Sequence, residues 1–203
     1  MKVYTGRLCQ ESNKAKMLFY LANQDVVRGV SFCATLDYTT CLVCAALDGH
    51  VWRLPYEVDE IAVPPLCENC RCVLLPVTEL AEFNSSTRPA AASDFWQDAA
   101  IRYGKKYPGK DWNRLAYSTR LKYYYAEQRA FEEETGHSAF DQVPQTMNFS
   151  AWLRTKTEPV QNRYLGELRG NLFRRYNLDL IDFVDRSTWS LIPQKTLLER
   201  YNR

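Results

Sequence analysis

Four cysteines, arranged as two matched pairs, carry the clearest chemistry in this sequence. Cys41 and Cys44 form one C-x-x-C motif, and Cys67 and Cys70 form a second, with 22 residues between the pairs. A C-x-x-C turn lets two thiolates bind one metal ion, and two such turns complete the four-ligand shell of a structural zinc site. The spacing therefore predicts one structural zinc ion held by these four thiolates.

Two nearby residues are alternative metal ligands. Cys72 lies two residues beyond Cys70 and could replace it, and His50 lies six residues beyond Cys44 and offers an imidazole nitrogen. The other interpretation is a set of buried free thiols or disulfides, since unpaired cysteine is among the most buried residue types. Five of the seven cysteines fall within 32 residues, however, and this clustering favours the metal site.

The segments around these cysteines predict the elements that position them. Asp48 and Gly49 form a two-residue hairpin signal with apolar residues on both sides. Residues 33–39 are β-prone, and residues 73–77 predict a closing strand with Pro76 at an edge. The core of this β unit is too small to bury enough apolar surface for a stable fold by itself. Zinc binding would therefore contribute to its folding. We therefore expect an α+β fold, in which zinc staples a small β-hairpin unit and a mostly helical C-terminal region follows.

The same residues resemble the pattern of a known family. Residues 34–37 read Ala-Thr-Leu-Asp, residues 41–49 read C-x-x-C-x-x-Leu-Asp-Gly, and residues 64–72 end in Cys-Glu-Asn-Cys-Arg-Cys. This pattern is similar to that of the phage head morphogenesis family, the minor head proteins related to the F protein of phage Mu. Cys67 stands where the family usually has histidine. Because both residue types bind zinc, the difference supports a metal role for this position.

A second stretch resembles the C-terminal segment of that family. Residues 164–172 carry the Leu-Gly-x-x-Arg-x-x-Leu helix pattern, and residues 178–185 end in Asp-Phe-Val-Asp. Members of the family usually carry a long helical region before the cysteine motif. This chain begins at the last helix of that region, expected at residues 11–23 with Leu18 and Phe19 on its apolar side. We therefore expect most of the family's N-terminal helical region to be lacking.

The resemblance implies a non-enzymatic structural protein of the phage virion. Minor head proteins associate with the capsid interior or the portal and assist head morphogenesis or DNA delivery. The implied partners are therefore the major capsid or portal protein, with several copies per particle, in the virion head and in the host cytoplasm during assembly. The alternative is a free-standing nucleic-acid-binding zinc protein with DNA as its partner.

Other function classes find little support in the sequence. A four-thiolate shell leaves no position for a reactive water, and the chain has no Gly-rich phosphate loop, HExxH or GxSxG motif. No apolar run approaches the roughly 18 residues of a membrane span. The first residues contain no apolar core of a signal peptide, so we expect reduced thiols that are available to zinc.

Positive charge and aromatic residues gather in one window of an otherwise balanced chain. The formal net charge is +2, yet residues 102–130 hold eight Lys or Arg against two Asp or Glu. Lys and Arg neutralise phosphates and aromatic rings stack on bases. Tyr, Trp and Arg are also enriched at protein interfaces. We favour a protein-docking surface, with core packing and DNA contact as the alternatives.

Helical spacing separates buried from exposed residues in this window. It places Trp112 and Tyr123 on the buried stripe of a helix from about 111 to 134, with Gly136 as its C-terminal cap. Aromatic residues off this stripe and the basic residues nearby are the candidate partner contacts. They are Tyr117, Tyr124, Tyr125, Lys105, Lys106, Arg114, Arg120 and Lys122.

Composition divides the chain into four parts. Residues 1–83 would hold the N-terminal helix and the zinc-binding β unit, and the small, polar residues 84–93 would form a linker. Residues 94–148 would form a helical, aromatic and basic insertion. Residues 149–203 would form a C-terminal helical segment.

Overall fold

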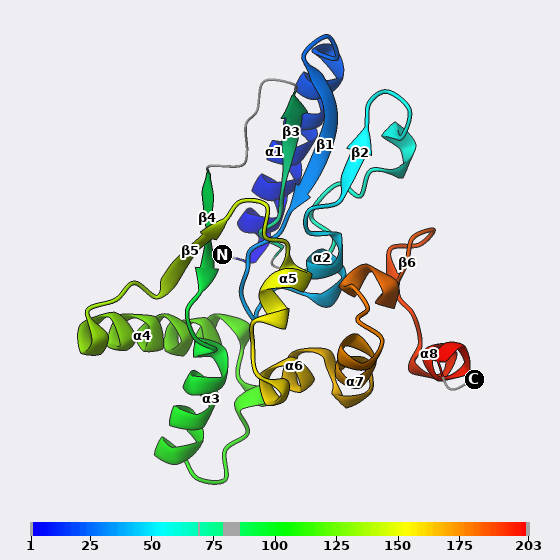
Figure 1. Cartoon of the computed structure of the whole chain (residues 1–203). Helices are drawn as coiled ribbons and strands as arrows, with labels where there is room; N and C mark the ends of the chain where they lie inside the picture. The colour runs from blue at the N-terminus through cyan, green and yellow to red at the C-terminus, as the bar shows by residue number, and fades with distance from the viewer. Residues whose placement is uncertain (1, 69, 79–85, 202–203) are drawn as a thin grey trace. The chain divides into compact units, whose positions relative to one another are not determined.

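The computed structural model describes residues 2–68, 70–78 and 86–201 (Figure 1). The described chain divides into two compact units. We call them the cysteine unit and the aromatic unit. The cysteine unit comprises the described parts of residues 1–36, 40–86 and 144–203, and the aromatic unit comprises residues 37–39 and 87–143.

A three-stranded antiparallel sheet forms the centre of the cysteine unit. Strand β1 (Val27–Cys33) lies between β2 (Val51–Arg53) and β3 (Val73–Thr78). Val30 and Phe32 of β1 are fully buried. Pro76 lies in β3, at the edge of the sheet, where its missing N–H removes no bond to a further strand. The predicted closing strand with an edge proline is therefore confirmed.

Helix α1 (Lys2–Ala22) packs along β3 and β1 (Figure 1). Its buried residues Asn13, Met17 and Tyr20 recur at the spacing of one helix face. The Tyr20 hydroxyl donates to the carbonyl of Leu74 in β3, at 3.1 Å. Leu18 and Phe19, which we expected on the apolar side, are 70% and 62% exposed. The helix therefore attaches to the sheet through a face that contains polar side chains.

The segment before Asp48 differs from the predicted hairpin. Helix α2 (Leu42–Leu47) occupies it, and Asp48 is the C-terminal cap of this helix. Gly49 follows with a φ of 81°, a conformation that commonly ends a helix. The chain then enters β2, which pairs with β1. An Asp-Gly pair therefore turns the chain here as predicted, but from a helix into a strand.

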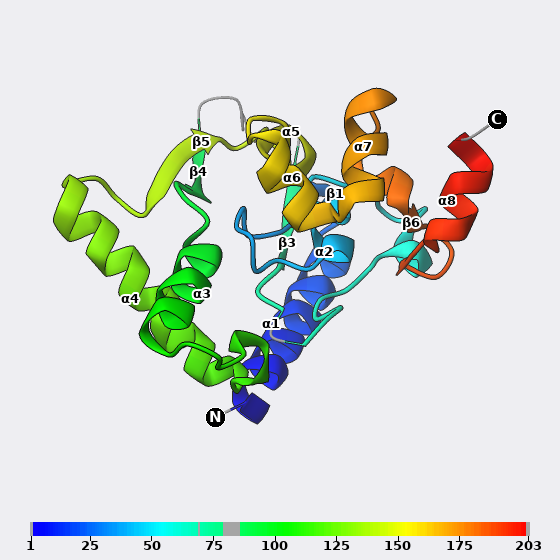
Figure 2. The same ribbon diagram turned by 90° about the horizontal axis from the view of Figure 1, so that it is seen from below.

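The C-terminal segment belongs to the cysteine unit, where α2 packs against α5 and η4. Gly166, with a φ of 80°, separates α6 from α7, and the two helices run in different directions (Figure 2). The remaining elements of the unit are η1 (Val58–Glu60), α5 (Phe149–Arg154), α6 (Glu158–Leu165), α7 (Glu167–Arg175), η4 (Leu180–Phe183), β6 (Val184–Asp185), β7 (Ser190–Leu191) and α8 (Gln194–Tyr201).

The aromatic unit consists of a two-stranded sheet and two packed helices. Strands β4 (Thr87–Ala91) and β5 (Phe140–Pro144) form the sheet, and α3 (Phe95–Lys106) packs against α4 (Tyr117–Thr135). A short 3₁₀ helix, η3 (Trp112–Arg114), precedes α4. β4 falls within the predicted linker, whose first two residues lie outside the described residues. Burial of Arg88, Ala90 and Ala91 explains why this polar segment forms a strand.

The buried face of α4 differs from the predicted one. Tyr124 is buried, with its ring 6.4 Å from the ring of Phe95 and 6.0 Å from that of Trp96. Tyr123 is only half-buried. The predicted stripe failed because Trp112 belongs to the separate helix η3 and therefore does not set the register of α4. Tyr124 is core, so its assignment as a partner contact was wrong, whereas the predicted cap at Gly136 is confirmed.

The element content confirms the α+β class, with the cysteines beside the three-stranded sheet. Among the described residues, no helix combines the length and apolar character that crossing a membrane requires.

Candidate metal centre

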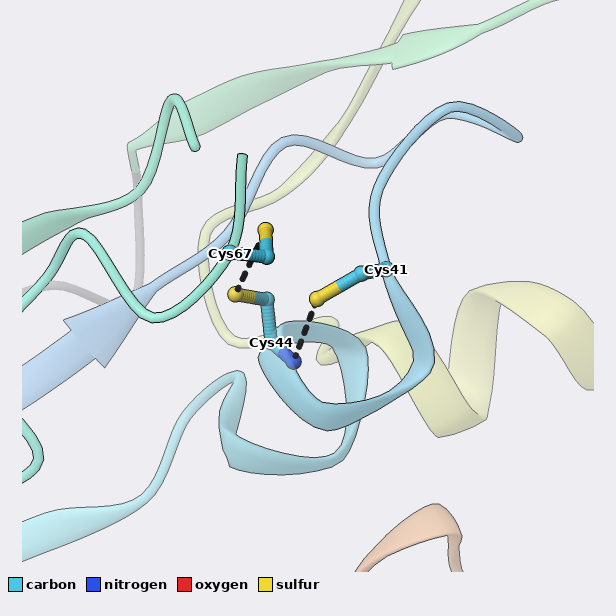
Figure 3. A group of neighbouring side chains, drawn as sticks. All are labelled: Cys41, Cys44 and Cys67. Atoms are coloured by element: carbon cyan, nitrogen blue, oxygen red, sulfur yellow. Dashed lines mark hydrogen bonds between the residues drawn. The ribbon is translucent and has the colours of Figure 1, made fainter. Parts of the chain in front are cut away.

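Cys41 and Cys44 are positioned by the start of helix α2. Cys41 is the N-cap residue, with an extended backbone, and its Sγ accepts a hydrogen bond from the Cys44 amide at 3.5 Å. The short side chain of Cys41 thus bends back over the first helical turn, as a capping residue does. This turn places both sulfurs on the same side of the chain (Figure 3).

The second group of cysteines lies on the segment that leads into β3. The Cys70 amide donates to the carbonyl of Cys67 at 3.2 Å, which closes a tight turn between these two residues. Cys72 directly precedes Val73, the first residue of β3. Cys70 and Cys72 are buried, whereas Cys67 is partly exposed.

The sulfur atoms are spaced for a metal ion. The Sγ of Cys44 lies 3.8 Å from the Sγ of Cys67 and 3.8 Å from that of Cys70. In tetrahedral zinc with Zn–S bonds of about 2.3 Å, neighbouring sulfurs are about 3.8 Å apart. A disulfide would require about 2.05 Å. These two distances therefore match two edges of a four-sulfur zinc shell.

Five cysteines join the cluster, as two triplets that share one member. Cys41, Cys44 and Cys67 form the first triplet, and Cys44, Cys70 and Cys72 form the second. Within each triplet all sulfurs lie within 4.8 Å of one another. Cys44, the shared member, is fully buried. The structure thus brings together the four predicted ligands and the alternative ligand Cys72.

His50, the other alternative ligand, belongs to neither triplet among the described residues. Its ring packs against Trp52, at a centroid distance of 4.7 Å, and lies 6.1 Å from the ring of Trp189. Burial, and then the positive charge of Arg186, lower its pKa. His50 is therefore a packed aromatic side chain. Its position six residues after Cys44 did not indicate a metal ligand.

Hydrogen bonds between sulfurs shift the thiol pKa values in opposite directions. Bonding with Cys44, and then with Cys67, lowers the pKa of Cys41 to about 3. Bonding with Cys44 also lowers the pKa of Cys70, while bonding with Cys41 raises the pKa of Cys44. Thiols this close share their protons, so only part of the cluster ionises without a cation. A zinc ion would displace the remaining protons, because it binds thiolates.

The position of Cys72 depends on a residue that no motif of the sequence singles out. Asn13 on α1 is buried; its Nδ2 donates to the carbonyl of Cys72 at 3.4 Å, and its Oδ1 accepts from the Leu74 amide at 3.2 Å. In the sequence, Asn13 lies on the same helix face as Met17 and Tyr20, not on the apolar side expected at Leu18 and Phe19. Asn13 therefore supports the cluster from 59 residues away.

The candidate partner contacts lie in the aromatic unit. Tyr125 is 50% exposed, and Tyr117 is half-buried. The Arg120 guanidinium lies over the ring of Trp96, at 5.4 Å, and near the ring of Tyr117, at 6.0 Å. The basic side chains at the remaining predicted positions are exposed, namely Lys105, Lys106, Arg114 and Lys122.

A cavity of about 410 Å³ lies between α3 and α4. Glu127 lines it with its side chain only 7% exposed, and the Nε of Arg102 lies 2.8 Å from the Glu127 carboxylate. Burial raises the pKa of Glu127, and the charge of Arg102 opposes this shift. No local pattern in the sequence indicates this ion pair, because its members lie 25 positions apart.

No protein-family model, curated protein or solved structure matches this chain. The resemblance to the phage head morphogenesis family therefore stays a prediction from the motifs given above.

Proposed function

We propose that this protein is a non-enzymatic structural component of a phage virion, a minor head protein that carries a structural zinc ion and acts through protein contacts. The observation that carries the proposal is the spacing at Cys44, whose sulfur lies 3.8 Å from those of Cys67 and Cys70. This spacing suits zinc, and the residues around it resemble the minor head pattern.

The described thiols fit a structural zinc ion. Five sulfur donors are gathered, neither triplet contains a carboxylate or an imidazole, and soft thiolates are good zinc ligands. When bound, zinc would cross-link the start of α2 to the segment that leads into β3. Thiolate sites in finger peptides bind zinc with about 10–16 kcal/mol at neutral pH, so binding here would be coupled to folding.

Residues of the cysteine motif make structural contacts with one another. The Ala34 amide donates to the Asp48 carboxylate at 2.8 Å, which ties the Ala-Thr-Leu-Asp stretch to the Leu-Asp-Gly turn. The guanidinium of Arg71, between Cys70 and Cys72, donates to the Thr40 hydroxyl at 3.5 Å. Residues of the motif therefore pack against one another, as expected if the motif marks one structural unit. This packing supports the resemblance.

The second stretch of the resemblance belongs to the same unit. The Tyr164 hydroxyl donates to the carbonyl of Thr40, next to the first cysteine pair, at 2.7 Å. The guanidinium of Arg169, in the Leu-Gly-x-x-Arg pattern, donates to the carbonyl of Ile192 at 3.1 Å. Two motif blocks that lie far apart in the sequence thus pack together, as expected if both belong to one domain.

In this proposal the aromatic unit supplies the contact surface. It exposes Tyr125 together with several basic side chains, and Tyr and Arg are enriched at protein interfaces. The partners would be the major capsid or portal protein. The protein would then act in the host cytoplasm during assembly and remain in the virion head in several copies.

Elemental analysis of protein purified without added metal tests the zinc site. We expect about one zinc ion per chain, the stoichiometry of a four-ligand structural site. Cys44→Ser removes the thiol shared by both triplets and should lose the metal, whereas Cys33→Ser, outside both triplets, should retain it. A zinc content near zero in the unaltered protein would overturn the metal site.

Co-sedimentation with phage heads tests the assembly role. The zinc-loaded protein should sediment with heads assembled from capsid and portal proteins, including after nuclease treatment, and Tyr125→Ala should reduce the bound fraction. Protein that stays at the top of the gradient with capsid-only and with portal-containing heads would overturn this role, whatever its zinc content.

A nucleic-acid-binding zinc protein is the second candidate function. The Nζ atoms of Lys106 and Lys110 lie 5.4 and 5.3 Å from the centre of the Tyr107 ring, so cations and an aromatic face occur together. Such a surface suits a phosphate backbone with unpaired bases. DNA binding that weakens steeply with salt, without binding to heads, would favour this candidate.

A further inference from the structure

The cysteine cluster contains one thiol more than a tetrahedral zinc ion needs. Structural zinc takes four ligands. Here Cys41 and Cys67 share a triplet with Cys44, and Cys70 and Cys72 share the other triplet with the same residue. Any single four-ligand shell therefore leaves one of the five thiols without the metal.

Cys67 and Cys72 differ in how the fold holds them. Cys67 is partly exposed, whereas Cys72 is 2% exposed. The carbonyl of Cys72 accepts a hydrogen bond from Asn13, and the next residue, Val73, pairs with Cys33 of β1. The sheet and α1 thus keep Cys72 at the cluster, while Cys67 is partly exposed to solvent.

We propose that Cys72 is a reserve ligand, which replaces Cys67 when that thiol is lost or blocked. The inference rests on the proposed zinc site. In the exchange, the bond from zinc to the Cys67 sulfur breaks and a bond to the Cys72 sulfur forms. The proton of the Cys72 thiol passes to the released Cys67 sulfur, or to water when that sulfur is blocked. The ion has four thiolate ligands before and after the exchange.

The geometry already places Cys72 beside two of the ligands that would remain. The Cys72 sulfur already lies within 4.8 Å of the sulfurs of Cys44 and Cys70. Ligand sulfurs in a zinc tetrahedron are about 3.8 Å apart, so the distances from Cys72 to Cys44 and to Cys70 must each shorten by no more than about 1 Å. A rotation of the Cys72 side chain, or a shift of the ion, would supply this movement.

Cobalt substitution of the full-length protein tests the proposal. Cobalt(II) occupies zinc sites, and its sulfur-to-cobalt absorption grows with the number of thiolate ligands. We expect equal absorption per bound cobalt in the unaltered protein, in Cys67→Ser and in Cys72→Ser. The double variant should show about three quarters of it. Its zinc affinity should fall at least about tenfold, because loss of outer-shell partners alone costs about 10–100-fold.

The outcomes of this experiment are distinct. A three-thiolate spectrum in Cys67→Ser alone would overturn the reserve role of Cys72. A three-thiolate spectrum in Cys72→Ser alone would also overturn it, since Cys72 would then be a resident ligand. Absence of cobalt and zinc binding in the unaltered protein would instead mean that the proposed zinc site itself fails.

A second measurement avoids any folding defect of the cluster variants. Zinc-loaded Cys33→Ser protein is treated with iodoacetamide, which alkylates an accessible thiol and releases iodide, and the modified position is found by peptide mass spectrometry. We expect alkylation of Cys67 with zinc retained. Release of one zinc ion for each Cys67 alkylated would overturn the proposal. Zinc retention without any Cys67 modification, under conditions that alkylate free glutathione completely, would also overturn it.

Discussion

The side-chain amide of Asn13 binds the main chain of Cys72 across two segments that lie 59 residues apart. The same side chain accepts a hydrogen bond from the Leu74 amide. It therefore bonds the main chain on both sides of Val73, at the start of β3. Asn13 is 1% exposed, and water therefore has little access to replace either bond. One buried side chain thus links α1, β3 and the cysteine cluster.

We expect Asn13→Ala to lower the free energy of unfolding by about 1–3 kcal/mol, because it leaves buried backbone groups without partners. It should also weaken zinc binding, since the segment that carries Cys70 and leads into β3 loses its anchor. Urea unfolding and chelator competition measure the two effects. Ser12→Ala, on the exposed side of α1, is the matched control and should change neither quantity. Equal stability of the two variants would contradict the anchoring role.

Local patterns in the sequence predicted the cysteine cluster better than they predicted packing. The C-x-x-C spacing fixes two sulfurs within one turn, and Cys41 and Cys44 accordingly meet at the start of a helix. Asn13 and Cys72 are brought together only by the tertiary fold. Tyr124 was misassigned for a related reason, because α4 carries apolar residues on several sides and the contacts with α3 decide which side is buried.

Two glycines provide a test of backbone conformation. Gly49 has a φ of 81°, and a Cβ there would lie 3.2 Å from the Cβ of Asn148. Gly49→Ala should therefore destabilise the protein by at least about 1–2 kcal/mol, the cost of the left-handed conformation for other residues. Gly104 lies within α3, where an added Cβ would meet nothing within 4 Å, so Gly104→Ala should stabilise the protein by about 0.5–1 kcal/mol.

Thermal unfolding of the two alanine variants checks this pair. The melting temperature should fall for Gly49→Ala and rise for Gly104→Ala. A neutral Gly49→Ala variant would contradict the turn conformation that connects α2 to β2.

The buried carboxyl group of Glu127 predicts a dependence of stability on pH. Burial raises its pKa above the ordinary value of 4.5, and Arg102 only partly opposes this shift. Between the unfolded and the folded pKa, the folded state therefore holds more protons than the unfolded state. Stability should fall as pH rises through this range. Glu127→Gln removes this contribution.

Urea midpoints of the unaltered protein and Glu127→Gln, measured from pH 4 upward, check the sign. The unaltered protein should lose stability relative to the variant as pH rises above the ordinary glutamate value. Arg102→Gln should enlarge the loss, because it removes the charge that lowers the Glu127 pKa. A constant difference, or a gain for the unaltered protein, would contradict the assigned shift.

Two adjacent tyrosines of α4 separate core packing from partner contact. Tyr124 is 5% exposed and packs against Phe95 and Trp96, whereas Tyr125 is 50% exposed. Tyr124→Ala should lower the free energy of unfolding by roughly 3–5 kcal/mol, as loss of a buried aromatic side chain does. Tyr125→Ala should change it by no more than about 0.5 kcal/mol.

Binding to heads should follow the opposite order. A truncated aromatic anchor costs at least about 2 kcal/mol of binding when it is a hot spot, so Tyr125→Ala should weaken co-sedimentation about 30-fold. Tyr124→Phe keeps the buried ring and should bind heads as the unaltered protein does. Normal binding by Tyr125→Ala would show that this tyrosine is no part of a docking surface. The exposed residues Lys105, Lys106, Arg114 and Lys122 would then be the next positions to substitute, because they share the aromatic unit with Tyr125.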